Sequence, residues 1–205
     1  CPAPQAGVVP NKPQPIAPDH ARMSTVCAID FGTSNSAIAL VQKNGTRLVE
    51  LEAGVVTMPT AVFYAVEGLS AFQQPQTSYG RAAINAYVEG VEGRLMRSMK
   101  SILGSTLAEQ ATDTGGGHSV RYLDVIATYL RHLKTLAQEA AGQQLDQVVL
   151  GRPVFFVDDD PERDAAAQAA LEAAARQVGF KDVRFQYEPI AAALDFESTA
   201  DDERL

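Results

Sequence analysis

A short stretch near the start of the sequence ends an apolar run with a carboxylate and then turns through small polar residues. Asp30 follows the run Val26–Ile29, and Gly32-Thr33-Ser34-Asn35 begins two residues later. Consecutive backbone N–H groups in a tight turn can bind phosphate, and a glycine lets the backbone approach the ligand closely. A carboxylate such as Asp30 could hold Mg²⁺ through water. The alternative is an ordinary hairpin turn, because Asp, Gly, Ser and Asn are common turn residues.

Lys100 and Glu188 are two further residues that could act on a phosphate group. An ammonium at Lys100 would offset charge that develops during phosphoryl transfer, although a single lysine is also a common solvated surface residue. Glu188 precedes a proline at an expected helix start, where it could orient an attacking or metal-bound water. It could equally be a first-turn acid that interacts with the helix dipole.

Other motifs for nucleotide or metal chemistry do not fit. The loop after Asp30 matches neither GxxxxGK[ST] nor GxGxxG, which argues against the common nucleotide-binding folds. The three histidines are scattered and have no metal-ligand spacing. We interpret Asp158-Asp159-Asp160 as the solvated start of a helix, with Asp160 as its N-cap before Pro161.

Composition indicates a packed globular protein without a polyanion-binding surface. The 205 residues are 46% hydrophobic and 20% charged, which suits one large or two small domains. The net charge of −8 argues against nucleic acid as a partner, since phosphate contacts need clustered Lys and Arg. No apolar run reaches the ~18 residues of a membrane span. The two cysteines, Cys1 and Cys27, suit a reducing cytosol, so we expect a cytoplasmic protein.

Residues 1–22 differ from the rest of the chain. They hold six of its eleven prolines and lack the apolar core of a signal peptide. We interpret them as a disordered proline-rich tail or a cloning remnant, with Met23 as the natural first residue.

The periodicity predicts strands and then alternating helices and strands. The expected strands are 26–30, 37–42, 46–51 (after an Asn44-Gly45 turn), 61–66, 147–150 and 183–186. The expected helices are 81–87, 121–141 (ended by Gly142), 161–178 and one opening at Pro189. Residues 68–121 are less regular and suggest an inserted subdomain, with a polar loop over 68–79 and a flexible break at 114–117.

This order of elements indicates an α/β sheet with right-handed crossovers. Ligands on such sheets bind beyond the carboxyl ends of the strands. Asp30, Pro153 and Glu188 each follow an expected strand end, so we expect them to converge on one crevice.

Three segments together resemble the DnaK-type chaperones, the seventy-kilodalton heat-shock family. Residues 28–36, AIDFGTSNS, resemble that family's first phosphate loop. Residues 99–104, MKSILG, are similar to the segment that bears its catalytic lysine, and residues 187–194, YEPIAAAL, resemble its first connecting segment, NEPTAAAL. The segments follow the family's order and approximate spacing, and the resemblance covers residues 26–197.

The resemblance implies an actin-like ATPase (ribonuclease H-like) fold, with residues 23–205 forming the first lobe of its nucleotide-binding domain. It implies ATP/ADP and Mg²⁺ as cofactors, with Asp30 at the hydration shell of the metal, Lys100 facing the γ-phosphate and Glu188 orienting water. The β- and γ-phosphates would be wrapped by Gly32, Thr33, Ser34 and Asn35. Pro153 would match the family's hinge proline, and Arg163 the arginine that senses the nucleotide.

The chain also departs from the family pattern. Residues 151–156, GRPVFF, replace the usual VPAYF form, Tyr187 replaces an asparagine, and Ser34 replaces a threonine. These departures point to a divergent, short, bacterial-looking branch. The family's second phosphate loop, DLGGGT, does not occur before Leu205, so this stretch supplies about half of a nucleotide cleft. We therefore expect the 205 residues alone to bind ATP poorly and to hydrolyse it hardly at all.

For the complete protein, the resemblance implies an ATP-hydrolysing chaperone that acts on unfolded polypeptides with co-chaperones, through regions outside this chain. Two alternatives stay open at this point. One is another actin-like ATPase, such as a filament-forming or sugar-kinase relative. The other is a non-catalytic interaction module that has kept the fold.

Overall fold

The computed structural model describes residues 25–42, 45–69 and 73–200, with side chains as far as Leu194. Cys1, the proline-rich segment 1–22, Met23 and the expected Asn44 turn lie outside the described residues.

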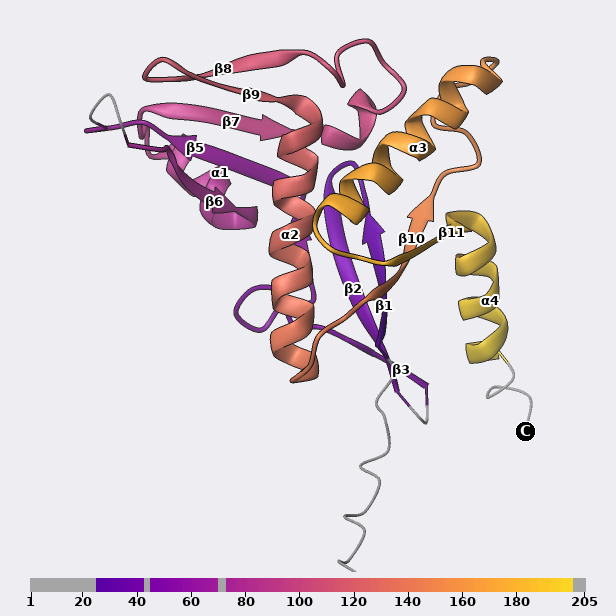
Figure 1. Cartoon of the computed structure of the whole chain (residues 1–205). Helices are drawn as coiled ribbons and strands as arrows, with labels where there is room; N and C mark the ends of the chain where they lie inside the picture. The colour runs from indigo at the N-terminus through magenta and orange to yellow at the C-terminus, as the bar shows by residue number, and fades with distance from the viewer. Residues whose placement is uncertain (1–24, 43–44, 70–72, 201–205) are drawn as a thin grey trace, which may run out of the picture.

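The larger of the sheets has six strands and carries the expected α/β topology. Its strands run in the order β11-β10-β1-β2-β3, and β4 also pairs with β2 (Figure 1). They are β1 (Val26–Phe31), β2 (Asn35–Gln42), β3 (Gly45–Leu48), β4 (Thr57–Pro59), β10 (Gln147–Arg152) and β11 (Asp182–Tyr187). Strands β1, β2 and β3 are antiparallel neighbours, whereas β10 and β11 join β1 in parallel. This confirms the α/β interpretation.

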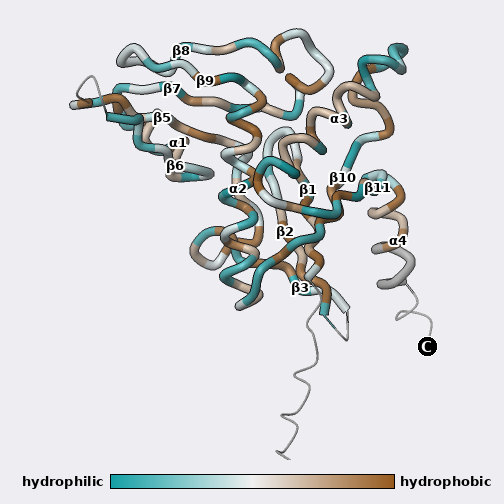
Figure 2. Tube along the Cα trace, viewed as in Figure 1, coloured by the Kyte–Doolittle hydropathy of each residue, from teal (hydrophilic) through white to brown (hydrophobic). Residues whose placement is uncertain are grey.

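Two helices cover one face of this sheet, and residue alternation decides what lies on each face. Helices α2 (Tyr122–Ala141) and α3 (Pro161–Gln177) pack on the face that holds Cys27, Ile29 and Phe31, all fully buried. Since side chains alternate along a strand, Ala28 and Asp30 lie on the opposite face. Figure 2 shows hydrophobic residues recurring along β1, β2 and α2, with hydrophilic residues at the N-terminal end of α3.

The ends of both long helices agree with their sequence signals. Helix α2 stops at Gly142, whose φ of 65° is the left-handed conformation that favours glycine. Helix α3 starts after Asp160, whose carboxylate accepts the backbone N–H of Arg163 at 3.0 Å, and Pro161 is its first residue. At the other end of α3, the Lys134 Nζ donates to the Val178 carbonyl at 3.2 Å. The predicted helices 121–141 and 161–178 are thus confirmed.

The region between the first strands and α2 forms a second sheet and a hairpin. The sheet has the order β6-β5-β7, and the hairpin pairs β8 with β9. The elements are β5 (Ala61–Ala65), β6 (Gln76–Tyr79), α1 (Gly80–Val88), β7 (Gly93–Arg97), the 3-10 turn η1 (Met99–Ile102), β8 (Ala111–Gly115) and β9 (His118–Arg121).

Three sequence expectations in these regions were wrong. The polar stretch 68–79 ends in β6, which pairs with β5, and polar residues are tolerated there because β6 is an edge strand. The expected flexible break at 114–117 is the tight turn of the β8–β9 hairpin, where three consecutive glycines have positive φ. The expected strand 46–51 ends at Leu48, beyond which Val49 and Leu51 are buried outside a strand. The inserted subdomain over 68–121 stays a prediction, and its sheet includes β5 from before residue 68.

Within the described ranges, no helix combines the length and the apolar character needed to cross a bilayer.

The interface between α2 and the sheet should dominate stability. Leu130 of α2 is 0% exposed, whereas Leu107 in the loop after η1 is 45% exposed. Leu130→Ala should lower the free energy of unfolding by about 2–5 kcal/mol, because it leaves a cavity in the core. Leu107→Ala, the matched control, should change it by less than about 1 kcal/mol. Urea denaturation measures both, and equal losses would contradict this assignment of the core.

Candidate functional site

A hollow of about 340 Å³ lies on the face of the large sheet opposite α2 and α3. The strands contribute Asp30, Gly151 and Gln186 to its lining, and helix α4 (Glu188–Ala200), which begins where β11 ends, contributes Glu188 and two alanines, Ala191 and Ala192. Two of the three residues expected at strand ends, Asp30 and Glu188, therefore share one cavity. Small side chains leave the floor of the cavity open.

Lys100 reaches this site from the second sheet. Its Nζ donates to the Glu188 Oε1, and the two residues form an ion pair. The lysine is 8% exposed and sits in the turn η1, which directly follows Ser98. Ser98 has a φ of 54°, a left-handed conformation that is costly for a residue other than glycine. The backbone thus bends sharply just before Lys100, and the lysine side chain meets a residue 88 positions later in the chain.

Asp30 and Glu188 lie close enough to repel each other. Desolvation raises the pKa of the Asp30 carboxyl above its usual 3.8, the charge of Glu188 raises it further, and Lys100 opposes the rise. A Cβ at Gly151 would lie 3.4 Å from the Glu188 Cγ and 3.7 Å from the Asp30 Oδ1. Any longer side chain at position 151 would fill the space between the carboxylates, so Gly151 keeps that space open.

The loop after Asp30 is held from behind by Thr60. The Thr60 Oγ1 donates to the Gly32 carbonyl at 2.8 Å, and the Thr60 N–H donates to the Ser34 carbonyl at 2.9 Å. The described backbone contains no cis peptide bond, and in a trans peptide the N–H points opposite to the carbonyl. The N–H groups of Thr33 and Asn35 therefore point away from Thr60. Two N–H groups on the side away from Thr60 are available to contact an anion.

Only glycine fits at position 32 of this loop, because a Cβ there would lie 2.2 Å from the Asn35 carbonyl oxygen. The same Thr60 hydroxyl also forms a hydrogen bond with the Ser36 Oγ at 2.9 Å. The fully buried Tyr129 of α2 donates to the Pro59 carbonyl at 3.1 Å, and burial raises the pKa of Tyr129 to about 12. The loop is thus supported by a buried polar network that reaches α2.

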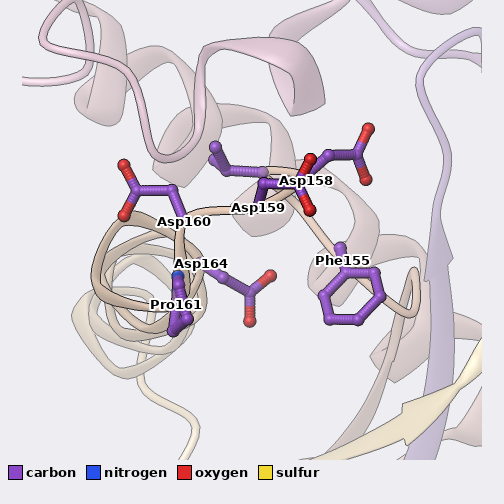
Figure 3. A pocket seen from close by; sticks show the side chains of 7 residues that line it. Phe155, Asp158, Asp159, Asp160, Pro161 and Asp164 are labelled. Atoms are coloured by element: carbon purple, nitrogen blue, oxygen red, sulfur yellow. The ribbon is translucent and has the colours of Figure 1, made fainter.

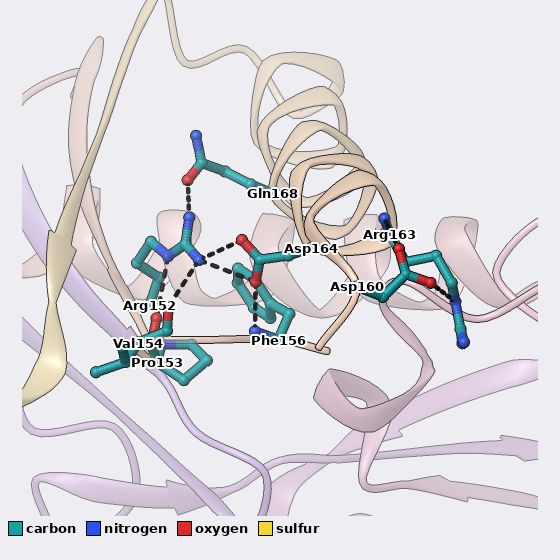
Figure 4. A network of polar contacts seen from close by, with 8 residues as sticks. All are labelled: Arg152, Pro153, Val154, Phe156, Asp160, Arg163, Asp164 and Gln168. Atoms are coloured by element: carbon teal, nitrogen blue, oxygen red, sulfur yellow. Dashed lines mark hydrogen bonds and ion pairs between the residues drawn. The ribbon is translucent and has the colours of Figure 1, made fainter. Parts of the chain in front are cut away.

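Pro153 and Arg163 are not among the residues that line this cavity. Pro153 follows β10, and its carbonyl accepts the Arg152 Nε at 3.0 Å. The Arg163 side chain is exposed on the first turn of α3 and donates to the Gly104 carbonyl at 2.8 Å. Figure 4 shows it directed away from the contacts of Arg152. The structure brings Asp30, Lys100 and Glu188 together and leaves Pro153 and Arg163 apart from them, so the roles of the latter two stay predictions.

A second hollow, of about 600 Å³, lies at the start of α3 (Figure 3). Its lining includes Phe155 and four carboxylates, Asp158, Asp159, Asp160 and Asp164. It is the larger of the two, but so many negative charges would repel a phosphate group. We therefore assign the functional site to the smaller hollow beside Lys100.

The donor set at Asp30 suits magnesium held through water. Across the described residues, no group of three or more His, Cys, Asp or Glu is placed to hold a metal ion directly. Mg²⁺ commonly binds through one or two carboxylates, several waters and the oxygens of a substrate phosphate. Asp30 and Glu188 beside one cavity fit that mode.

Sequence reasoning missed Thr60 and Gly151 as parts of the site. Thr60 reaches the loop because β4 pairs with β2, and Gly151 reaches Glu188 because β10 pairs with β11. Both pairings join segments far apart in the chain, and no local pattern signals them.

Comparison with known proteins gives a consistent family match. A family model described as Hsp70 protein matches residues 26–204. The chain is 30% identical to the chaperone protein HscA homolog of Tolumonas auensis over 176 residues, which covers 82% of this chain and 27% of the relative. Its identity to the HscA homologs of Shewanella amazonensis and Haemophilus influenzae is 28% over 201 residues and 29% over 194, each covering 89% of this chain and 30% of the relative. The chain thus spans less than a third of the length of these curated relatives.

Because the pKa of Asp30 is raised, replacing this residue should increase the free energy of unfolding by an amount that depends on pH. Because the unfolded chain loses the Asp30 proton first, stability falls as the pH rises from 3.8 to the native pKa, and the cost is complete above that pKa; below 3.8 the carboxyl is protonated in both folded and unfolded chains and the cost is absent. Asp30→Asn should therefore be more stable than wild type at neutral pH, by less than about 1 kcal/mol, because the cavity that desolvates one side of the carboxyl is open and solvent screens its charge. The gain should vanish as the pH falls to 3.8 and below, as urea denaturation at a series of pH values would measure.

Asp164→Asn is the matched control with the opposite sign. The hydrogen bond from Arg152 and the backbone N–H of Phe156 lower the pKa of Asp164. Its removal should destabilise the protein at neutral pH, and the loss should shrink as the pH falls through the native pKa. Losses for both variants at neutral pH would contradict the electrostatic description of Asp30.

Thr60→Val tests the support of the loop. Valine keeps the shape but removes the hydroxyl that bonds Gly32 and Ser36, so the free energy of unfolding should fall by about 1–3 kcal/mol. Thr60→Ser keeps the hydroxyl and should cost less. Equal losses in denaturation experiments would mean that the methyl group, and not the hydroxyl, matters.

Proposed function

The chain belongs to the Hsp70 family and has the actin-like ATPase fold of that family's nucleotide-binding domain, and from this we propose that it binds ATP with Mg²⁺. The observation that carries the proposal is the convergence of Asp30, Lys100 and Glu188 on one cavity, beside a loop whose N–H groups point away from Thr60. Three elements distant in the sequence supply these residues.

Each residue has a role that follows from its chemistry. The N–H groups of Thr33 and Asn35, with the exposed hydroxyls of Thr33 and Ser34, bind β- and γ-phosphate oxygens beside Gly32. Lys100 turns from Glu188 toward the γ-phosphate and offsets the charge that develops there during hydrolysis. Glu188 would orient the attacking water, and Asp30 would hold the metal ion through water. When bound, Mg²⁺ neutralises charge on the β- and γ-phosphate oxygens.

The family's chaperone activity is proposed for the polypeptide that completes this cleft. The matched relatives are chaperones by name and more than three times as long as the stretch matched here. We infer that residues 23–205 form the first lobe of the nucleotide-binding domain, and that polypeptide clients and co-chaperones bind elsewhere, in the cytoplasm. Alone, this lobe leaves one side of the triphosphate in water, where charge interactions are weak, so it binds ATP poorly and hydrolyses it hardly at all.

Pro153 and Arg163 are proposed to relay the state of the nucleotide. Pro153 lies at the end of β10, two residues after Gly151 beside the cavity. Arg163 contacts the carbonyl of Gly104, four residues after Lys100. A movement of either Lys100 or β10 would therefore reach the first turn of α3.

An interaction module that has kept the fold without turnover is the second candidate. It is favoured by the large apolar side chains of α4 that are exposed beside the site, at Ile190 and Leu194. Such surface commonly marks a contact with another protein or domain.

Lys100→Ala separates the two candidates. In the polypeptide as its source cells make it, loss of this ammonium should weaken Mg·ATP binding about tenfold or more and abolish hydrolysis, because a charged hydrogen bond to phosphate is lost. Lys181→Ala removes a surface lysine that pairs with Asp146 and should change neither. Calorimetry and phosphate release measure the two quantities. ATP binding and turnover that survive in Lys100→Ala would rule out the proposed site, and wild-type protein without turnover would favour the interaction module.

A further inference from the structure

Arg152 is a buried cation at the end of β10, on the face of the sheet opposite the proposed nucleotide cavity. It is 7% exposed. It belongs to the GRPVFF segment, at which the sequence departs from the family pattern, and neither the fold nor the proposed chemistry has so far given it a role.

The guanidinium of Arg152 is fixed by partners on α3 and on the segment that follows β10 (Figure 4). The Nη2 donates to both carboxylate oxygens of Asp164, at 2.8 and 3.1 Å, and the Nη1 donates to the Gln168 Oε1. The Nε and Nη2 also donate to the carbonyls of Pro153 and Val154, at 3.0 and 3.2 Å. A planar fork with this many partners has little freedom to move.

The same guanidinium lies against the ring of Tyr187. The Arg152 Cζ is 5.1 Å from the centre of that ring, within the range of a cation–π contact. Arg152 and Tyr187 are also register partners, as the last residues of the parallel strands β10 and β11. Both residues are departures from the family pattern, and they contact each other.

Tyr187 directly precedes Glu188, so a constraint on its ring constrains the start of α4. Gly151, the residue before Arg152, lies beside the Glu188 side chain on the opposite face of the sheet. Arg152 is therefore linked to Glu188 in two ways. Its guanidinium contacts the ring of Tyr187, which directly precedes Glu188, and its chain neighbour Gly151 packs against the Glu188 side chain. Glu188 in turn pairs with Lys100.

We propose that Arg152 is a positioning residue of the site: anchored to α3 by Asp164 and Gln168, it holds Tyr187 and so aims the Glu188 carboxylate at Lys100. The meaning of this alignment for nucleotide binding rests on the proposed function. The alignment itself is a property of the free protein and can be measured without nucleotide.

A purely structural role fits the contacts less well. A buried ion pair contributes little net stability compared with well-packed apolar side chains, so packing alone does not call for an arginine here. Tyr187 is 43% exposed, so its contact with Arg152 buries little apolar area. What the arrangement supplies is a fixed direction for the chain just before Glu188.

The test follows the Lys100 side chain by NMR in protein with ¹³C-labelled lysine, with Glu188→Gln as the reference for a broken pair. Arg152→Lys keeps the charge but loses the planar fork, and Tyr187→Leu removes the stacked ring from an exposed position. Both should move the Lys100 signal toward that of Glu188→Gln and weaken Mg·ATP binding about tenfold, the size of effect typical for directly coupled residues. Tyr187→Phe keeps the ring and should leave the signal unchanged.

Arg176→Lys is the matched control, because Arg176 forms an exposed ion pair with Glu172 and both lie on α3, the helix that also carries Asp164. If Arg152→Lys fails to fold, Tyr187→Leu decides the question. A Lys100 signal that stays at its wild-type position in folded Arg152→Lys or Tyr187→Leu would overturn the proposal, whatever happens to the melting temperature. Failure of the wild-type polypeptide, as its source cells make it, to bind Mg·ATP would count against the proposed function, and the NMR signal would still test the role of Arg152.

Discussion

The ion pair between Lys100 and Glu188 is the contact on which the arrangement of the site depends. It joins a turn that follows the small sheet to the junction between β11 and α4 in the large sheet. A lysine this buried needs a partner for its charge, and a carboxylate in reach of solvent can supply one without being fully desolvated itself. The pair therefore ties together two parts of the chain that share no strand pairing.

The balance of charge around that pair explains why the site suits an anionic ligand with a divalent cation. Two carboxylates and one ammonium meet at the cavity, so the site is negative without a ligand. In the proposed function, Lys100 would pair with the triphosphate, and a metal ion would then neutralise Asp30 and Glu188. The backbone dipoles of the loop would add to the attraction of Lys100 for phosphate.

The sequence predicted those parts of the fold that depend on local signals. Helices α2 and α3 were predicted because Gly142, Asp160 and Pro161 mark their ends by backbone conformation and capping. Strand β6 and the β8–β9 hairpin were missed because their pairing partners, and not their composition, make them strands. Local chemistry alone left Asp30, Lys100 and Glu188 ambiguous.

For those three residues, the family resemblance supplied the link that residue chemistry lacked, and the folded chain brings them together. Thr60, Gly151 and Arg152 carry no such signature. Each acts through a contact that exists only after distant strands have paired, so spacing along the chain cannot reveal it.

The alternation along β1 and β10 has an evolutionary consequence. One set of residues faces the helices and the other faces the cavity, so inserting or deleting a single residue within either strand would exchange the two sets. Ile29 would then face the cavity while Asp30 entered the core, and folding and binding would fail together. Changes in length should accumulate instead in connecting segments such as 153–160, where extra residues leave the strand register untouched.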